Sequence, residues 1–426
     1  MDSSTSTTRA GRASWRTRGR TIVLAAALTV GALPVGTAAA GGPSTLVVRP
    51  GESIQAAVDR ASSGDTIKIA PGTYQEAVCV EGKGLKIIGS GPNTTLITWP
   101  EWGQGAPLPD VAPNACWTAS ENTDAEGDPG TLADDVSGIF FLNPDSPVTV
   151  AKLGTRNHPA SGIVGWQADG FTVKATSGIG HERYGVLAAA STDITIAGNV
   201  ERGVDRGAPW FSGTGGISVG DSDGANARIT ANYVEGFNLG IFFRESRGAS
   251  ITANKVTGNC VGVLVFDDAV TEIPDNTRQV QGGDVTIKAN ASIANNRYCI
   301  AGRDGTQLVS GVGMSIANAD SVRVIGNRIT DNRPVVPAGQ APTNYPGGGL
   351  TLVSFAPPPG TLPPGVAGPG LVENVEVKAN RILDNEPVDV WVTRAIPGTL
   401  LQEAGPGITF RGNNCRVSDP AEICAP

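Results

Sequence analysis

Short stretches of alternating apolar and polar residues recur along most of the chain, and each ends at asparagine or glycine. The repeated phrase is an apolar residue, two further residues and an asparagine, at intervals of 22 to 53 residues. The asparagines that close this phrase are Asn199, Asn232, Asn254, Asn290, Asn327, Asn380 and Asn413. Such alternation is typical of short β-strands buried on one face. A constant phrase at variable spacing predicts a repeated coil with insertions at its corners.

A second short strand follows in each unit and begins at a glycine. These glycines are Gly216, Gly240, Gly262, Gly313 and Gly349. No amphipathic helix of about a dozen residues separates the strands, so parallel strands require the chain to stack coil on coil. Asparagine suits the corners because it tolerates the left-handed conformation, and stacked asparagines can hydrogen-bond from coil to coil. We therefore predict an all-β solenoid with an asparagine ladder.

The N-terminal part of this region carries a series of characteristic short sequences. They are GESIQAAVDR at 51–60, GDTI at 64–67, PGTY at 71–74 and LKIIG at 85–89. This series resembles the opening of secreted right-handed parallel β-helix proteins of the pectate-lyase-like superfamily, and the resemblance extends over most of residues 44–415. It implies that residues 41–426 form a single-stranded right-handed parallel β-helix with an N-terminal capping α-helix at about 51–62.

The apolar positions of the expected capping helix agree with this resemblance. Ile54, Ala57, Val58 and Ala61 fall on one helical face, at spacings of three and four. The first coil of a solenoid needs such a cover, because its core and strand edges would otherwise face water. The superfamily includes lyases, hydrolases, epimerases and proteins without known activity, so the resemblance implies a fold and no particular reaction.

The first forty residues have the three-part organisation of a secretory signal peptide. Residues 9–20 are basic, 21–35 are apolar and 36–40 end in small residues, which predicts cleavage near Ala40 and a secreted protein. The competing interpretation is a membrane anchor. The apolar run is shorter than the ~20 residues of a spanning helix, and no later segment is apolar enough to span, so we expect no stable membrane insertion.

Composition and charge restrict the possible partners. The 57 glycines and 30 prolines disfavour a helical bundle, because both residues break helices. The net charge is −8 for the whole chain, and the first forty residues hold five arginines and one aspartate, which leaves −12 for the remainder. A body this acidic is a poor non-specific binder of nucleic acid. We expect a monomer without a nucleic-acid partner.

The six cysteines predict three disulfides in an exported chain. Six cysteines allow 15 pairings. We predict the pairing of neighbours, because each bond then closes a local loop: Cys79 with Cys116, Cys260 with Cys299, and Cys415 with Cys424. Segments rich in proline and glycine interrupt the coil at about 99–135, 333–348 and 355–370, and loops of a solenoid often gather on its binding face.

Alignment of the second strands on their first glycine brings three carboxylates into one column. Asp221, Glu245 and Asp267 each lie five positions after the glycine of consecutive units. Adjacent coils are ~4.8 Å apart, so these side chains are candidate catalytic acids and bases or, alternatively, calcium ligands. Asp221 and Asp267 would lie about 9.6 Å apart, near the separation in inverting glycosidases. The alternative is three solvated turn residues that point away from one another.

The other candidate site residues are a histidine, an arginine and several aromatic residues. His181, which lies beside Glu182 and Arg183, is a candidate general acid or base. Arg244, Trp210 and Phe211 are candidates for substrate binding. The aromatic side chains that could stack on sugar rings are Trp99, Trp102, Trp117, Trp166, Trp210 and Phe211.

The catalytic motifs of named relatives are absent, which leaves two classes of function open. The chain lacks the Gly-His-Gly of polygalacturonase-like hydrolases, the arginine motif of pectate lyases and the Asp-Pro-His-Asp of alginate epimerases. The first class is an enzyme that cleaves an extracellular polysaccharide as a lyase or hydrolase, with calcium as the one cofactor to consider. The second is a non-catalytic extracellular protein with a carbohydrate-binding, adhesive or structural role.

Overall fold

The computed structural model describes residues 42–101, 109, 111–121, 132–204, 214–268, 281–301, 307–356 and 369–424. Pro43–Pro426 form one compact unit. The signal peptide predicted for residues 1–40 lies outside the described residues.

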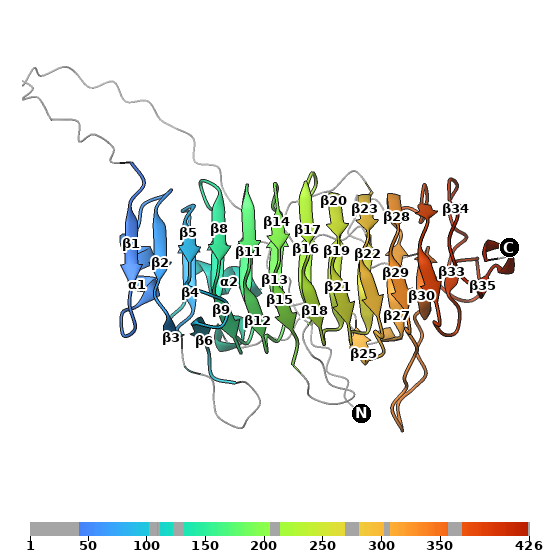
Figure 1. Ribbon diagram of the computed structural model, residues 1–426, viewed down its shortest axis with the longest axis horizontal. Coiled ribbons are helices and arrows are strands. Elements are labelled where there is room, and N and C mark those ends of the chain that lie inside the picture. The colour runs from blue at the N-terminus through green and yellow to red at the C-terminus, as the bar shows by residue number, and fades with distance from the viewer. Residues whose placement is uncertain are drawn as a thin grey trace, which may run out of the picture. The chain divides into compact units, whose positions relative to one another are not determined.

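Three long sheets run along this unit, and nearly every coil of the chain adds one strand to each (Figure 1). Sheet A consists, in spatial order, of β1 (Thr45–Val48), β2 (Thr66–Ile69), β5 (Lys86–Ile88), β8 (Val148–Ala151), β11 (Phe171–Lys174), β14 (Thr195–Ala197), β17 (Ala227–Thr230), β20 (Arg247–Thr252), β23 (Gly283–Lys288), β28 (Asp320–Ile325), β31 (Glu376–Lys378) and β34 (Thr409–Arg411). Sheet B consists of β3 (Gly72–Gln75), β6 (Thr95–Thr98), β9 (Gly154–Arg156), β12 (Ser177–Ile179), β15 (Val200–Arg202), β18 (Tyr233–Glu235), β21 (Lys255–Thr257), β24 (Ala291–Ile293), β29 (Arg328–Thr330) and β32 (Arg381–Leu383).

Sheet C completes the coils and carries the longest connections at its sides. It consists of β4 (Val78–Glu81), β7 (Ile139–Leu142), β10 (Ile163–Trp166), β13 (Tyr184–Ala189), β16 (Gly215–Gly220), β19 (Leu239–Arg244), β22 (Val261–Phe266), β27 (Val312–Ala317), β30 (Gly348–Val353), β33 (Val390–Val392) and β35 (Ser418–Asp419). Outside the three sheets, the described residues form an antiparallel hairpin and four short helices: β25 (Tyr298–Ala301), β26 (Gln307–Ser310), α1 (Ile54–Arg60), α2 (Ala115–Glu121), η1 (Leu132–Asp135) and η2 (Ala421–Ile423).

The strands of successive coils pair in parallel and in register, so equivalent residues form columns. Strands β19 and β22, for example, pair Ile241 with Val263 and Phe243 with Val265. These four side chains point inward and belong to a core that runs from the first coil to the last. The predicted all-β solenoid of parallel strands is therefore confirmed.

An asparagine ladder runs along the corner between sheets A and B, as predicted. In each rung the side-chain amide and the backbone N–H of one asparagine donate to the Oδ1 of the asparagine in the next coil. Asn232 donates in this way to Asn254, at 2.9 and 3.0 Å, and Asn254 donates to Asn290 at 2.9 Å. The ladder continues to Asn413 and satisfies buried backbone groups that the corner would otherwise leave unpaired.

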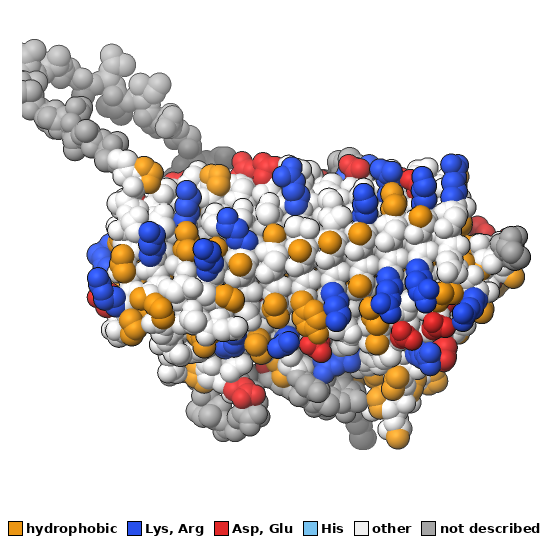
Figure 2. Space-filling view, viewed as in Figure 1, with side chains coloured by type: hydrophobic (Ala, Val, Ile, Leu, Met, Phe, Trp, Pro, Cys, Tyr) orange, Lys and Arg blue, Asp and Glu red, His pale blue; other side chains and the backbone are white. Residues whose placement is uncertain are grey.

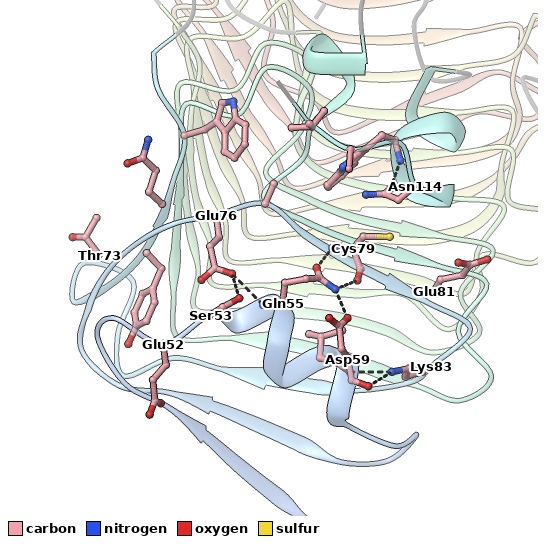
Figure 3. A pocket seen from close by; sticks show the side chains of 18 of the residues that line it. Glu52, Ser53, Gln55, Asp59, Thr73, Glu76, Cys79, Glu81, Lys83 and Asn114 are labelled. Carbon is pink, nitrogen blue, oxygen red and sulfur yellow. Dashed lines mark hydrogen bonds between the residues drawn. The ribbon is translucent and has the colours of Figure 1, made fainter. Parts of the chain in front are cut away.

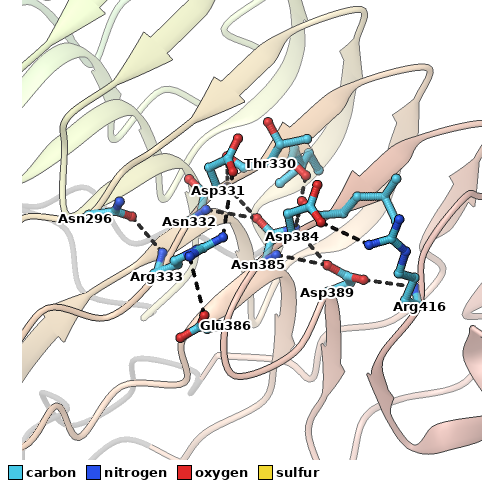
Figure 4. A network of polar contacts seen from close by, with 12 residues as sticks. Asn296, Thr330, Asp331, Asn332, Arg333, Asp384, Asn385, Glu386, Asp389 and Arg416 are labelled. Carbon is cyan, nitrogen blue, oxygen red and sulfur yellow. Dashed lines mark hydrogen bonds and ion pairs between the residues drawn. The ribbon is translucent and has the colours of Figure 1, made fainter.

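A second column of buried asparagines follows the strands of sheet B and ends at an aspartate (Figure 4). Asn259, Asn295, Asn332 and Asn385 bond from coil to coil in the same way. Asn385 then donates to Asp389, whose second carboxylate oxygen accepts the backbone N–H of Arg416 at 2.9 Å. The last coil is thereby hydrogen-bonded to the C-terminal segment.

The glycines that open the strands of sheet C form a close backbone stack. A Cβ placed on Gly240 would lie 2.5 Å from the carbonyl oxygen of Gly262, and a Cβ on Gly262 would lie 2.5 Å from that of Gly313. No real Cβ approaches an oxygen so closely, so a side chain is sterically excluded here. The recurrent glycine in the sequence therefore marks a packing requirement of the coil.

Helix α1 lies where the sequence predicts a helix, at the N-terminal end of the β-helix (Figure 1). The Ser53 Oγ accepts the Ala56 N–H at its first turn, and Ile54, Ala57 and Val58 are buried in the main core. All three predicted disulfides are also confirmed: Cys79–Cys116, Cys260–Cys299 and Cys415–Cys424.

The predicted insertions are only partly irregular. The segment at 99–135, predicted as a loop insertion, lies between β6 and β7 and contains the short helices α2 and η1. Residues 333–347 have no regular structure, and the following strand begins at Gly348. Most of the segment at 355–370 lies outside the described residues. None of the described helices is long and apolar enough to cross a membrane.

The face formed by sheets A and B carries no concentrated charge. Lys and Arg side chains are spread along its whole length in Figure 2, among hydrophobic and uncharged side chains. Several of these cations pair with neighbouring acids, as Arg323 does with Glu376 at 3.1 Å. Sheet C, where the long connections lie, is therefore the more promising face for a binding site.

Candidate functional site

Two described segments pack against the outer face of sheet C. Near the N-terminal end, Cys116 and Trp117 of α2 are buried against Phe140 and Trp166 of β7 and β10. Toward the C-terminal end, Val309 of β26 packs with Val261, Leu264 and neighbouring side chains. Trp117 and Trp166 are only 3% and 5% exposed. Trp117 and Trp166 therefore pack against sheet C, and Trp117 also lines a pocket beside α1.

Between these covered parts lies a cluster of carboxyl groups around one arginine, which we call the acid cluster. Asp221 follows β16, Glu245 follows β19 and Asp268 follows β22 by two residues. The Arg244 Nη2 lies 3.3 Å from Glu245 Oε1 and 3.3 Å from Asp268 Oδ2. Asp221 and Glu245 are 5% and 0% exposed. The alternative of solvated turn residues is therefore wrong for this pair.

The environment of Glu245 favours its neutral form. Burial raises the pKa of Glu245 strongly, and hydrogen bonding with the Asp268 and Asp221 carboxyl groups adds to the rise, while Arg244 opposes it. No N–H or O–H of the described residues donates to either Glu245 oxygen with good geometry. A proton on Glu245 supplies the missing donor to its neighbours. Burial and the neighbouring carboxyl groups therefore favour the protonated form of Glu245.

The third member of the predicted column is placed differently. The backbone at Asp221 and Glu245 is left-handed, with φ of 49° and 46°, whereas Asp267 does not adopt this conformation. The Asp267 carboxylate accepts the backbone N–H of Gly282. The structure thus brings Asp221 and Glu245 together as predicted, and adds Asp268 as a further carboxyl.

Metal binding at the predicted column is not supported by the described geometry. Among the residues that the structure describes, no group of three or more His, Cys, Asp or Glu side chains could hold a metal ion. Calcium at Asp221, Glu245 and Asp267 stays a prediction. The predicted substrate-binding residue Arg244 is held between two carboxyl groups, and Trp210 and Phe211 lie outside the described residues.

His181 is buried in the interior and does not face solvent. Its Nδ1 accepts the backbone N–H of His158 at 3.2 Å, and its Nε2 bonds the Thr155 hydroxyl at 2.9 Å. Burial and the neighbouring His158 lower the pKa of His181 well below its usual value. His181 is therefore a neutral residue with both ring nitrogens occupied, and this environment gives its predicted acid–base role no support.

A pocket of about 900 Å³ lies beside α1, at the N-terminal end of the β-helix, and we call it the α1 pocket (Figure 3). Its walls come from α1, from β3 and β4, and from the chain around α2. Trp99 and Asn114 line it on the side of α2. The sequence indicates Trp99 as an aromatic platform, but nothing in the repeat pattern shows that α1 and α2 enclose a pocket beside it.

The Asp268 side chain is the second feature that the sequence does not assign. The predicted column assumes equal spacing from each glycine, and Asp268 is one position further along the chain. The pair Asp267-Asp268 is visible in the sequence as two adjacent acids. Only the altered backbone at Asp267 shows which of the two reaches Glu245.

Comparison with known families agrees with this architecture. A family model described as "Right handed beta helix region" matches residues 161–356, which include the acid cluster and both asparagine columns over several coils. The fold of the chain is a right-handed parallel β-helix. No curated protein sequence matches the chain.

The solved structures that are similar to this β-helix include proteins of three different kinds. A double mutant of the periplasmic alginate epimerase AlgG is 12% identical, with a TM-score of 0.44 over 85% of this chain and 84% of that one. The catalytic domain of GH87 alpha-1,3-glucanase in complex with nigerose is 14% identical, with a TM-score of 0.44 over 88% and 66%. ORF18 of Geobacillus virus E2 is 11% identical, with a TM-score of 0.38 over 84% and 56%. At these values no activity is transferred to this β-helix.

Proposed function

We propose that this β-helix is a secreted protein that cleaves an extracellular polysaccharide at the acid cluster. The observation that carries the proposal is the buried Glu245, which is grouped with Asp268 around Arg244 and whose surroundings raise its pKa. Glycoside hydrolysis needs one carboxyl that donates a proton and one that activates water, and unlike surroundings separate their pKa values. Glu245 would protonate the glycosidic oxygen while Asp221 or Asp268 accepts a proton from the attacking water.

An unsatisfied polar atom in the acid cluster supports a binding role for this edge of sheet C. Asp221 Oδ1 is buried and has no hydrogen-bond partner among the described residues. Native proteins rarely leave such groups unpaired, and a substrate hydroxyl is a natural partner. The three disulfides agree with an oxidising compartment outside the cytosol.

The second candidate is a non-catalytic carbohydrate-binding or structural β-helix. It is favoured by the burial of Glu245, whose side chain is 1% exposed and meets no solvent in this conformation. In that case Glu245 shares its proton with the Asp221 and Asp268 carboxyl groups of the neighbouring coils. The acid cluster then links successive coils and only stabilises the fold.

A screen for polysaccharide cleavage separates the two candidates. The secreted form is incubated with plant, algal and bacterial polysaccharides, with calcium and with a chelator, alongside Glu245→Gln and the surface control Asp284→Asn. New reducing ends without ultraviolet absorbance of unsaturated uronates, lost only in Glu245→Gln, mean a hydrolase. Ultraviolet absorbance of unsaturated uronates means a lyase, and its loss with the chelator would assign calcium. No product from any polysaccharide would refute the catalytic proposal.

A further inference from the structure

The α1 pocket has the size and rigidity of a ligand site and lies apart from the acid cluster. Its volume of about 900 Å³ falls in the range of small-molecule sites, ~300–1,000 Å³. Gln55 exchanges two hydrogen bonds with the backbone of Cys79, at 2.8 and 3.1 Å. The disulfide from Cys79 to Cys116 joins the opposite wall to the same strand. The pocket is thus formed before any ligand binds.

Both ends of α1 are fixed by side chains of neighbouring coils. The Glu76 carboxylate accepts the backbone N–H groups of Ile54 and Gln55, at 3.0 and 3.1 Å, at the positive end of the helix dipole. The Lys83 ammonium donates to the carbonyl oxygens of Val58 and Ala61, at 2.9 and 3.1 Å, at the negative end. These two charged groups are therefore engaged in the fold.

Trp99 is a preorganised aromatic wall of this pocket. Its indole ring stacks on the buried imidazole of His158, with centroids 6.1 Å apart, and His158 stacks on His181 at 5.5 Å. His158 is itself held by a hydrogen bond of 3.1 Å to the Glu76 carbonyl oxygen. The stack extends from the interior to the partly exposed Trp99. The two buried histidines thus pack one behind the other against the Trp99 ring.

The charges around the pocket determine which sugars fit. Glu52, Asp59 and Glu81 line it, and Lys83 is the one cation among its described lining residues. Because Lys83 is engaged with α1, a uronate carboxylate would meet carboxylates and no free cation. Sugar hydroxyls, in contrast, can donate to these carboxylates while a ring stacks on Trp99.

We propose that the α1 pocket binds an uncharged oligosaccharide, with Trp99 as its stacking platform. This proposal rests on the proposed function only in that both involve a glycan. Binding here would hold a neutral chain near one end of the β-helix, independently of any cleavage at Glu245.

Calorimetric titration tests the proposal with neutral hexasaccharides of β-1,4-glucan, β-1,3-glucan, α-1,3-glucan and xylan, and with oligogalacturonate as the acidic counterpart. We expect at least one neutral chain to bind, and Trp99→Ala to weaken it by roughly tenfold or more, as loss of an aromatic contact implies. Trp391→Ala, which removes a partly exposed tryptophan of β33 at the other end, should leave the affinity unchanged. Oligosaccharide binding by Glu245→Gln should equal that of the wild type, because Glu245 lies outside the α1 pocket. Failure of the polysaccharide-cleavage screen would therefore leave the binding proposal standing.

A charge substitution provides a second test if Trp99→Ala perturbs the fold. Glu81 is exposed on the pocket rim, so Glu81→Lys is compatible with folding. It should create oligogalacturonate binding that the wild type lacks. The proposal is overturned if no neutral chain binds the wild type, if only oligogalacturonate binds it, or if a folded Trp99→Ala binds as tightly as the wild type.

Discussion

Cys79 in β4 and Cys116 in α2 are joined by a disulfide that fixes the helix to sheet C, with Cα atoms 5.7 Å apart. The bond lies beside the α1 pocket and within the cluster that contains Trp117, Phe140 and Trp166. A short helix that is otherwise part of a long connection is thereby held against the β-helix.

Removal of this bond should destabilise the protein more than removal of the C-terminal one. Cys79 and Cys116 are 37 residues apart and Cys415 and Cys424 are nine apart, so the chain-entropy model gives about 4 and about 3 kcal/mol. The measurement is denaturant unfolding of the two double alanine variants. Only the Cys79–Cys116 variant should also lose binding at the α1 pocket, and equal binding by both would contradict a clamping role.

The glycine stack of sheet C should not tolerate even a methyl group. Gly240→Ala places a Cβ 2.5 Å from the Gly262 carbonyl oxygen, with backbone that cannot move aside because the next coil lies behind it. We expect a loss of more than about 3 kcal/mol in the free energy of unfolding, above the usual cost of overpacking. Gly220→Ala is the control, since nothing lies within 4 Å of its added Cβ, and it should be nearly neutral. Equal unfolding midpoints would refute the steric argument.

The stability that each asparagine of the ladder contributes should depend on its position along the β-helix. Asn254 accepts two hydrogen bonds from Asn232 and donates to Asn290 and to the Ile229 carbonyl oxygen. Asn254→Ala leaves these buried groups unpaired, which should cost about 3 kcal/mol or more. Asn413 ends the ladder and is partly exposed, so water can replace its contacts, and Asn413→Ala should cost about 1 kcal/mol. Thermal unfolding of both variants measures the difference.

The repeat pattern predicted the structural features that recur in every coil, because one coil resembles the next. Asparagine and glycine recur because the corner and the backbone stack constrain the same position in every coil, so sequence spacing was enough to find them. The disulfides were predictable for a similar reason, because neighbouring cysteines close local loops. Helix α1 was identified from its amphipathic face and from the resemblance of its sequence.

The candidate site was less predictable because it lies where the coils differ from one another. The column at Asp221 and Glu245 follows the left-handed corner, but the backbone at Asp267 departs from it, and spacing alone could not show this. His181, a candidate general acid or base in the sequence, turns inward because Gly162 leaves space: a Cβ there would lie 2.8 Å from the His181 Nε2. The chain around α2 forms one wall of the α1 pocket. The sequence did not predict this helix, because its segment is rich in proline and glycine.

A buried glutamate that takes no part in the acid cluster should make stability depend on pH. Glu201 of β15 is 1% exposed, and its carboxyl group occupies space that the absent side chains of Gly178 and Gly185 leave open. Burial raises the pKa of Glu201 from 4.5 to about 8. The folded protein therefore keeps this proton over a range in which the unfolded chain has lost it.

The pKa of Glu201 is higher in the folded protein than in the unfolded chain, and this difference sets the sign of the pH effect on stability. The contribution of protonated Glu201 is fully present below about pH 4.5 and is lost as the pH rises through 8. Across this interval the contribution of Glu201 to the free energy of unfolding should fall by about 1.4 kcal/mol per pH unit, up to about 5 kcal/mol in total. Glu201→Gln imitates the neutral acid, so it should match the wild type near pH 5 and exceed it at pH 8. Glu235→Gln, a change at a partly exposed carboxyl in the next coil, controls for loss of a carboxyl. Parallel pH profiles for wild type and Glu201→Gln would show that Glu201 is ionised in the folded protein.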